Sequence, residues 1–229
     1  MMIPRTLEPE SMDTAEEADE YRKMNHEAVN ACFVHDLFAG GAVGPRVLDL
    51  GTGPAHIPIL ICEKDPEVEI MAVDSSIEML EVAKIEIELS GMIGRIQLEH
   101  GDAKNLSGFE QAAVDTVISN TLLHHLAEPG IAIAQAVKLL RPGGRLFLRD
   151  LFRPESDDEV ERLVTLYADG ESEQARQLFR QSLHAALTLS EIQSLVNDLP
   201  GGLGIPAQNV QMTSDRHWTI DWVMPASTT

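Results

Sequence analysis

The chain alternates short apolar runs with longer stretches in which apolar residues recur every three or four positions. The short runs have the length and composition of buried strands, and they span residues 47–50, 69–74, 96–100, 114–119 and 145–150. Between them, spacing such as that of Ile77, Leu80, Ala83 and Ile87 predicts amphipathic helices. Strands that alternate with helices favour right-handed crossovers, and therefore a parallel sheet with helices on both faces.

The segments that flank this core follow other patterns. Acidic residues and prolines are frequent in residues 1–13, which we expect to be disordered or loosely packed. Residues 14–45 have helical spacing and predict a helical cap, and residues 46–229 are expected to form the main domain. Within that domain we expect a helical insertion at about 154–186, and two alternating segments near its end suit a closing antiparallel pair.

Composition and charge narrow the class of protein. The 229 residues suit one sizeable domain, and no apolar stretch approaches the roughly 20 residues that span a bilayer. Because the acidic N-terminus also lacks an apolar signal segment, we expect a cytoplasmic protein without a membrane partner. The net charge of −20, from 37 acidic and 17 basic residues, disfavours a nucleic acid as main partner. Cys32 and Cys62 are expected to be reduced thiols. The sequence leaves open whether the chain forms a homodimer.

Residues 47–56 combine a buried strand with a glycine turn and the start of a helix. Gly51 and Gly53 permit positive φ and close backbone approach. Such a turn is expected to direct backbone N–H groups toward a ligand above the strand. Nucleotide-type ligands bind at this place in open α/β sheets. The stretch therefore predicts a nucleotide-type site.

Three acids stand at the carboxyl ends of successive predicted strands: Asp49, Asp74 and Asp102. Unpaired carboxylates are expensive to bury, so their recurrence beside the glycine turn indicates ligand binding rather than packing. A carboxylate at Asp74 can accept both hydroxyls of a ribose, and one at Asp102 can accept the exocyclic amine of adenine.

On these residues the sequence resembles class I S-adenosylmethionine-dependent methyltransferases of the small-molecule type, over about residues 46–150. The segment 47–55 is similar to the family's first motif, acid-x-Gly-x-Gly-x-Gly, with Ala55 in place of the third glycine. Further matches are Asp74, the segment 101–103, the fourth-strand segment 115–125 and the turn 140–146 before the fifth strand.

The resemblance implies a doubly wound, mostly parallel seven-stranded α/β sheet of Rossmann-like type, with an antiparallel last strand. It implies S-adenosyl-L-methionine as the methyl donor and S-adenosyl-L-homocysteine as the product. It further implies methyl transfer to a small-molecule acceptor by in-line displacement, mainly through positioning. The expected cofactor-binding residues are Asp49, Gly51, Thr52, Gly53, Asp74, Ser75, Asp102, Ala103 and Asn120.

Candidates for chemistry and for acceptor binding lie beside and beyond these motifs. Residues 120–126 are expected to begin a short helix, which places His124 and His125 on the acceptor side of the fourth strand. Either could act as a general base, and His125 is preferred. No metal is expected, because no acid follows the fourth strand to pair with Asp150. The candidate acceptor contacts are Tyr21, Met24, His26, Arg149, Arg153 and Tyr167.

Other interpretations stay open at this point. Ion pairs with nearby acids are the alternative for Arg149 and Arg153. A protein or RNA methyltransferase is the alternative among transferases, although the acidity counts against RNA. A non-catalytic, S-adenosylmethionine-binding regulatory protein would keep the same turn. A nicotinamide-dependent dehydrogenase is disfavoured, because His56 stands where its fingerprint has Gly or Ala.

Overall fold

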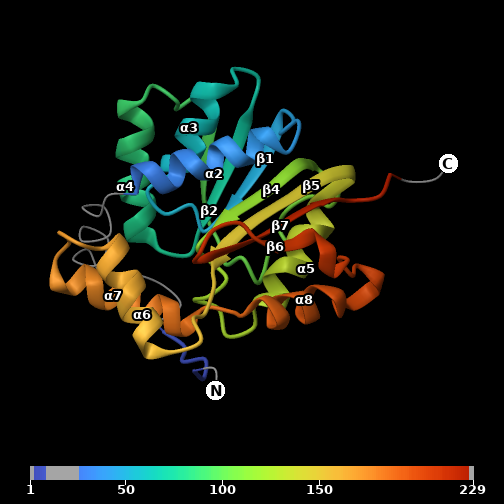
Figure 1. Cartoon of the computed structure of the whole chain (residues 1–229). Coiled ribbons are helices and arrows are strands. Elements are labelled where there is room, and N and C mark those ends of the chain that lie inside the picture. Colours follow the sequence, from blue (N-terminus) through green and yellow to red (C-terminus); the bar gives the residue numbers. More distant parts are fainter. Residues whose placement is uncertain (1–2, 9–25, 227–229) are drawn as a thin grey trace.

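The computed structural model describes residues 3–8 and 26–226, and its centre is a seven-stranded sheet (Figure 1). The strands are β1 (Arg46–Leu50), β2 (Glu69–Asp74), β3 (Ile96–His100), β4 (Val114–Asn120), β5 (Leu140–Leu151), β6 (Val210–Met212) and β7 (His217–Val223). Their order is β3-β2-β1-β4-β5-β7-β6. All neighbours from β3 to β5 are parallel, whereas β7 is antiparallel to both β5 and β6. The predicted doubly wound α/β sheet is confirmed.

Helices cover both faces of the sheet (Figure 1). They are α2 (Glu27–Ala39), α3 (His56–Lys64), α4 (Ile77–Leu89), α5 (Pro129–Leu139), α6 (Asp157–Tyr167), α7 (Glu173–Ala185) and α8 (Leu189–Asn197), with one-turn 3-10 helices at Pro200–Gly202 and Ala207–Asn209. Buried residues of α2, α3 and α4 share one core with β1 and β2, and those of α5 and α8 share a second core on the opposite face. The helices α6 and α7 make a third, smaller cluster. None of the helices in the described part of the chain has the length and apolar composition that crossing a bilayer needs.

Helix α2 is fastened to the sheet by aromatic packing and by buried arginines. Phe33 is fully buried and meets Phe147 of β5 edge-to-face, with ring centroids 5.1 Å apart. Arg145 donates to the carbonyl of Leu37 at 2.7 Å, so a charged group on β5 also caps the end of α2. These contacts fix α2, the helix that precedes the first strand. Residues 14–25 of the expected helical cap lie outside the described residues.

The first described residues, 3–8, lie against the protein rather than apart from it. Arg5 donates from Nε to the carbonyl of Ala185 at 2.7 Å. One of its terminal nitrogens donates to the carbonyls of His124 and Leu126, at 3.1 and 3.0 Å. We expected residues 1–13 to be loosely packed, and the described part of that segment instead joins the end of α7 to the loop after β4. The rest of it lies outside the described residues.

The loop after β4 differs from the short helix expected at residues 120–126. It consists of turns, and the next helix, α5, begins at Pro129. The physical reason is a competing set of hydrogen bonds: the amides of Leu123 and His124 both donate to the Asp150 carboxylate, at 2.5 and 3.1 Å. A side chain from β5 thus takes donors that a helix would have used.

Replacement of Phe33 tests how strongly α2 depends on this packing. Phe33→Ala is expected to lower the free energy of unfolding by about 3–5 kcal/mol, because it removes a fully buried ring and leaves a cavity against Phe147. Leu89→Ala is the control, since that side chain is 75% exposed, and it should change the free energy by less than about 0.5 kcal/mol. Denaturant unfolding of both variants measures the difference, and equal losses would contradict the assignment.

Candidate functional site

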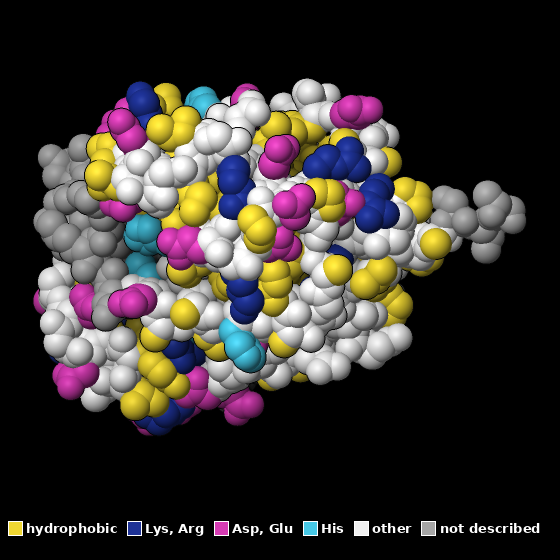
Figure 2. Space-filling model, turned by 90° about the horizontal axis from the view of Figure 1, so that it is seen from above, with side chains coloured by type: hydrophobic (Ala, Val, Ile, Leu, Met, Phe, Trp, Pro, Cys, Tyr) yellow, Lys and Arg dark blue, Asp and Glu magenta, His cyan; other side chains and the backbone are white. Residues whose placement is uncertain are grey.

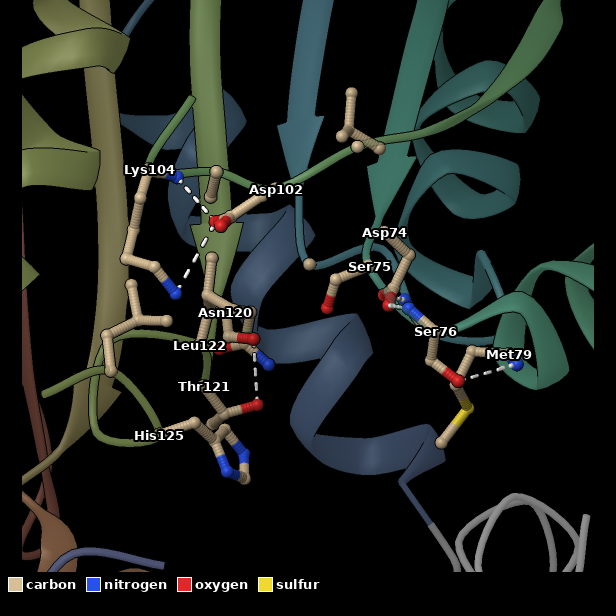
Figure 3. A pocket seen from close by; sticks show the side chains of 16 residues that line it. Asp74, Ser75, Ser76, Met79, Asp102, Lys104, Asn120, Thr121, Leu122 and His125 are labelled. Carbon is tan, nitrogen blue, oxygen red and sulfur yellow. Dashed lines mark hydrogen bonds and ion pairs between the residues drawn. The ribbon is translucent and has the colours of Figure 1, made fainter. Parts of the chain in front are cut away.

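A cavity of about 220 Å³ opens where β1, β2, β3 and β4 end (Figure 3). The strand order reverses between β1 and β4, and ligands of open α/β sheets bind at such a switch point. The lining residues are Gly51, Gly53, Val73, Asp74, Ser75, Ser76, Met79, Gly101, Asp102, Ala103, Lys104, Asn120, Thr121, Leu122, His125 and Leu126. Most of the predicted cofactor residues are therefore brought to one place.

The glycine turn after β1 has the predicted left-handed backbone, but its first N–H groups point elsewhere. Gly51 and Gly53 have φ of 70° and 53°, and Ala55 takes φ of 62° at the third motif position. The positive φ at Gly51 disfavours any side chain there, and a Cβ would also crowd Leu122, whose nearest carbon would lie 2.9 Å away. The amides of Gly51 and Thr52 both donate to the Val73 carbonyl. The turn is thus tied to β2, and the expectation that it offers these N–H groups to the ligand is wrong for both residues.

Asp74 at the end of β2 connects the turn to the start of α4. Its Oδ2 accepts the Gly53 amide at 2.8 Å and its Oδ1 accepts the Ser76 amide at 2.9 Å. Ser76 also begins α4, because its hydroxyl accepts the Met79 amide. Each oxygen of a carboxylate can accept more than one hydrogen bond, so Asp74 keeps acceptor capacity toward the cavity. In Figure 3 its side chain lies beside those of Ser75 and Ser76.

Asp102 lies opposite, in the turn that follows β3. Its side chain is about half exposed, and its Oδ1 accepts the Lys104 amide at 2.8 Å. The Lys104 ammonium approaches the same oxygen at 3.5 Å (Figure 3). Both of these contacts are to Oδ1, so the second oxygen of this half-exposed carboxylate can accept from a donor in the cavity.

Two buried polar groups border the inner end of the cavity. Asp49 is 3% exposed, and burial together with the nearby Asp74 raises the pKa of Asp49 to about 7, although the Thr52 side chain opposes the shift. Asp49 and Thr52 line a small recess with Gly51 and Gly53. The Oδ1 of Asn120, at the end of β4, is buried without a partner among the described residues. A buried acceptor of this kind is costly unless a ligand completes its hydrogen bond.

A second cavity of about 170 Å³ adjoins the first and shares Asn120, Thr121 and His125 with it. Its other lining residues are His26, Val29, Asn30, His124, Leu151, Tyr167, Ala168, Glu171, Leu178, Phe179, Ser182, Arg216 and His217. The predicted acceptor residues His26 and Tyr167 are therefore here, while Tyr21 and Met24 lie outside the described residues.

His124 and His125 belong to one buried cluster with Glu8 and Asp150. The Nδ1 of His124 lies 2.5 Å from Asp150 Oδ1, and its Nε2 lies 3.2 Å from Glu8 Oε1. The Nδ1 of His125 lies 3.1 Å from the same Glu8 oxygen. Burial disfavours the imidazolium, but Asp150 and Glu8 outweigh it and raise the pKa of His124 to about 9. Both nitrogens of His124 are thus occupied, which leaves His125 as the histidine with access to both cavities.

Arg149 and Arg153 do not have the positions that acceptor binding would require. Arg149 pairs with Asp36 at 2.6 Å, and Arg153 pairs with Glu191 at 2.6 Å. Both guanidinium groups are about 5% exposed, and neither is among the described residues that line the two cavities. Arg149 holds α2 to β5, and Arg153 holds α8 to the segment after β5. The ion-pair alternative is therefore the correct one, although the partners are distant in sequence.

The structure adds residues that sequence patterns did not indicate. Glu8 was missed because a long-range contact brings it to His124. Thr121 was missed because its sequence neighbours do not indicate its unusual backbone conformation. It has φ of 56°, which a β-branched residue rarely adopts and which costs about 1–3 kcal/mol. Strain of this size is concentrated at functional sites, and here it lies in the wall between the two cavities.

The comparisons with known proteins agree with this geometry. A family model described as a methyltransferase domain matches residues 43–195, which is more than half of the chain. The chain belongs to this methyltransferase family. Membership of a methyltransferase family sets the dehydrogenase interpretation aside.

Relatives of known activity resemble the chain in sequence, and solved methyltransferase structures share its fold. The chain is 30% identical to the ubiquinone biosynthesis O-methyltransferase of Xanthomonas euvesicatoria, over 48% of this chain and 44% of the relative. It is 30% identical to the trans-aconitate 2-methyltransferase of an Azoarcus species, over 49% and 40%. The chain spans less than half the length of these curated relatives.

An S-adenosylmethionine-dependent methyltransferase from Aquifex aeolicus has a TM-score of 0.67 at 13% identity, and the match covers 93% of this chain and 100% of that structure's chain. The plantazolicin methyltransferase BpumL, solved with S-adenosylhomocysteine, has a TM-score of 0.61 at 19% identity, over 80% and 67%.

The residues in the first cavity fit the methyl donor of this family. Asp74 offers acceptors for ribose hydroxyls, and the unpartnered Asn120 Oδ1 offers a further acceptor to a ligand in this cavity. Asp49 is a buried acid in the recess beside the turn, where a positively charged group would favour its ionised form.

The raised pKa of Asp49 predicts a pH-dependent affinity for S-adenosylhomocysteine. Below about pH 7 Asp49 is protonated in the free protein, and a ligand ammonium must drive that proton off when it binds. Affinity is therefore expected to fall as the pH drops from 8 to 6, by up to about tenfold per unit below 7. Calorimetry across this range measures the slope, and Asp49→Asn should flatten it. An unchanged slope in that variant would show that Asp49 is not the titrating group.

Proposed function

We propose that this methyltransferase transfers a methyl group to a small molecule bound in the second cavity. The observation that carries the proposal is the shared wall: Asn120, Thr121 and His125 line both cavities. A donor in the first and an acceptor in the second would therefore both contact these three residues. In-line displacement needs this alignment more than it needs a reactive side chain.

On the donor side we assign roles by position and by hydrogen-bonding capacity. S-adenosylmethionine supplies the methyl group on a sulfonium, whose departure needs no acid from the protein. Asp49, Gly51 and Gly53 would hold its methionine part, and Asp74 its ribose. Asp102 with Ala103 would flank the adenine. These assignments rest on the acids at successive strand ends and on the turn that joins them.

On the acceptor side the second cavity combines apolar surface with several polar groups, which include Glu171, Ser182 and His217. Leu151, Leu178 and Phe179 supply the apolar surface, and Asn30 and Arg216 stand among them. Such a lining suits a small molecule with an apolar body and one or two polar substituents. The relatives support a small-molecule acceptor, since they include a ubiquinone biosynthesis O-methyltransferase and a trans-aconitate 2-methyltransferase.

A general base is needed only when the attacking atom must lose a proton, and His125 is the residue we assign to that task. It reaches both cavities, whereas His124 is 3% exposed and bonded through both ring nitrogens. Glu8 would orient His125 through the contact at its Nδ1, which leaves Nε2 for the acceptor.

A macromolecular acceptor, either protein or RNA, is the second candidate, and the surface charge disfavours RNA. The net charge is −20, and on the face shown in Figure 2 basic and acidic side chains are interspersed without a continuous basic stripe among the coloured residues. RNA binding relies on such a stripe. A small acceptor therefore remains the proposal.

Removal of the Asp74 carboxylate tests the donor side. Asp74→Ala is expected to weaken S-adenosylhomocysteine binding by about 1.5–3 kcal/mol, the scale of a hydrogen bond to a charged group. Calorimetry and the ligand-induced rise in melting temperature measure the loss. Asp36→Ala is the control, because that acid pairs with Arg149 away from the cavity. Unchanged affinity in Asp74→Ala would remove Asp74 from the donor site.

Transfer itself is tested with S-adenosylmethionine labelled in its methyl group and a fractionated small-molecule extract. We expect label in one small-molecule fraction with the wild-type protein, and a rate about 10²–10⁴-fold lower with His125→Ala if a proton must be removed. Full activity of His125→Ala would end the base assignment. Label in protein or RNA of a whole lysate, and none in small molecules, would overturn the proposed acceptor class.

A further inference from the structure

The cluster of Glu8, His124 and His125 has the composition of a metal site. It is a group of three potential ligand side chains whose donor atoms all lie within 4.8 Å of one another. Glu8 Oε1 lies 3.2 Å from His124 Nε2 and 3.1 Å from His125 Nδ1. Adjacent ligands held about 2.0–2.1 Å from one metal ion are separated by about 2.9–3.4 Å. The two observed separations fall in this interval.

The surroundings of His124 resemble those of a metal ligand. Its other nitrogen, Nδ1, lies 2.5 Å from the fully buried carboxylate of Asp150. That carboxylate is fixed in turn by the backbone amides of Leu123 and Leu151. A carboxylate that orients a histidine from behind fixes its tautomer and directs the opposite nitrogen at the metal. Here the opposite nitrogen is the one that faces Glu8.

The third ligand is supplied by the N-terminal segment, which is itself anchored. Arg5, three residues before Glu8, donates hydrogen bonds to the carbonyls of Ala185, His124 and Leu126. The Glu8 side chain is 8% exposed and also accepts from the Ser182 hydroxyl at 3.2 Å. A carboxylate held this firmly beside two imidazoles is pre-organised as a ligand rather than placed there by a mobile surface arm.

We propose that Glu8, His124 and His125 bind one divalent transition-metal ion at the wall of the second cavity. Two imidazole nitrogens and one carboxylate oxygen favour ions such as Zn²⁺, Co²⁺ or Fe²⁺ over Mg²⁺ and Ca²⁺. With neutral histidines the cluster and Asp150 carry two negative charges, which a dication balances.

Three protein ligands leave coordination positions open, and His124, His125 and Ser182 all line the second cavity. An oxygen of the molecule in that cavity would complete the coordination. The ion would then promote loss of a proton from that oxygen to solvent, in place of His125, which cannot act as the base while it is a ligand through Nδ1. This last step rests on the proposed function, whereas the metal site itself does not. The prediction of no metal depends on the lack of an acid after β4, whereas the acid in this cluster is Glu8.

Calorimetric titration with Zn²⁺ tests the site in full-length protein made without a polyhistidine tag and stripped with a chelator. We expect about one equivalent to bind, with at least about tenfold weaker affinity in Glu8→Gln and in His125→Ala. Asp150→Asn should weaken it about 10–100-fold, as loss of an orienting carboxylate does. His35→Ala is the matched control: it removes an exposed imidazole beside another acid, Asp36, and should leave the affinity unchanged.

A second measurement keeps the proposal testable if a variant fails to fold. The absorption spectrum of Co²⁺ added to the stripped wild-type protein should differ from that of the free ion and should change back on Zn²⁺ addition. A spectrum identical to that of free Co²⁺, no binding of Zn²⁺, or equal affinity in wild type and Glu8→Gln would overturn the site. S-adenosylhomocysteine binding and methyl transfer are recorded separately, so a failed metal site and a failed transferase assignment give different results.

Discussion

The carboxylate of Asp150 is the group on which the arrangement around the two cavities depends. It is fully buried at the end of β5, accepts the amides of Leu123, His124 and Leu151, and pairs with the His124 ring. Burying a charge is costly unless it is compensated, and removing one partner of such a pair costs about 3–5 kcal/mol. The loop after β4 therefore has little freedom: it must turn so that its amides and His124 reach Asp150. This places His125 at the shared wall and positions His124 to receive Glu8.

The donor side depends on a similar but separate constraint. Asp74 accepts the amide of Gly53 and the amide of Ser76, while Val73 accepts the amides of Gly51 and Thr52. The glycine turn is therefore held in shape by the end of β2 before any ligand arrives. Pre-organisation of this kind reduces the ordering that binding must impose. It also means that the turn is positioned by protein hydrogen bonds, and that glycine is favoured at residue 51 by the positive φ and the close approach to Leu122 rather than by a need to free an amide.

The parts that sequence could predict are those set by local pattern. Apolar runs separated by helical spacing gave the strands β1 to β5 and the helices between them, and acids at strand ends indicated Asp49, Asp74 and Asp102. Contacts between distant segments had no such signal. The turns at 121–126 replaced an expected helix because Asp150 takes their amides, and Arg149 proved to be an internal ion-pair residue because Asp36 of α2 folds onto it. Glu8 could not be found by spacing, since nothing in the sequence near it specifies its partners.

The difference between features set by local pattern and contacts between distant segments explains why membership of the family does not by itself identify the acceptor. The family model covers residues 43–195, which include the glycine turn, Asp74, Asp102 and the whole loop after β4. The second cavity is completed from outside that range, by His26 and Asn30 of the preceding segment and by Arg216 and His217 of the following one, and Glu8 stands behind its histidines. Relatives that share the matched region can therefore keep the donor site and differ in these surrounding segments. If the acceptor binds in the second cavity as proposed, the residues that choose it are those that long-range packing, rather than the common motifs, brings to the wall.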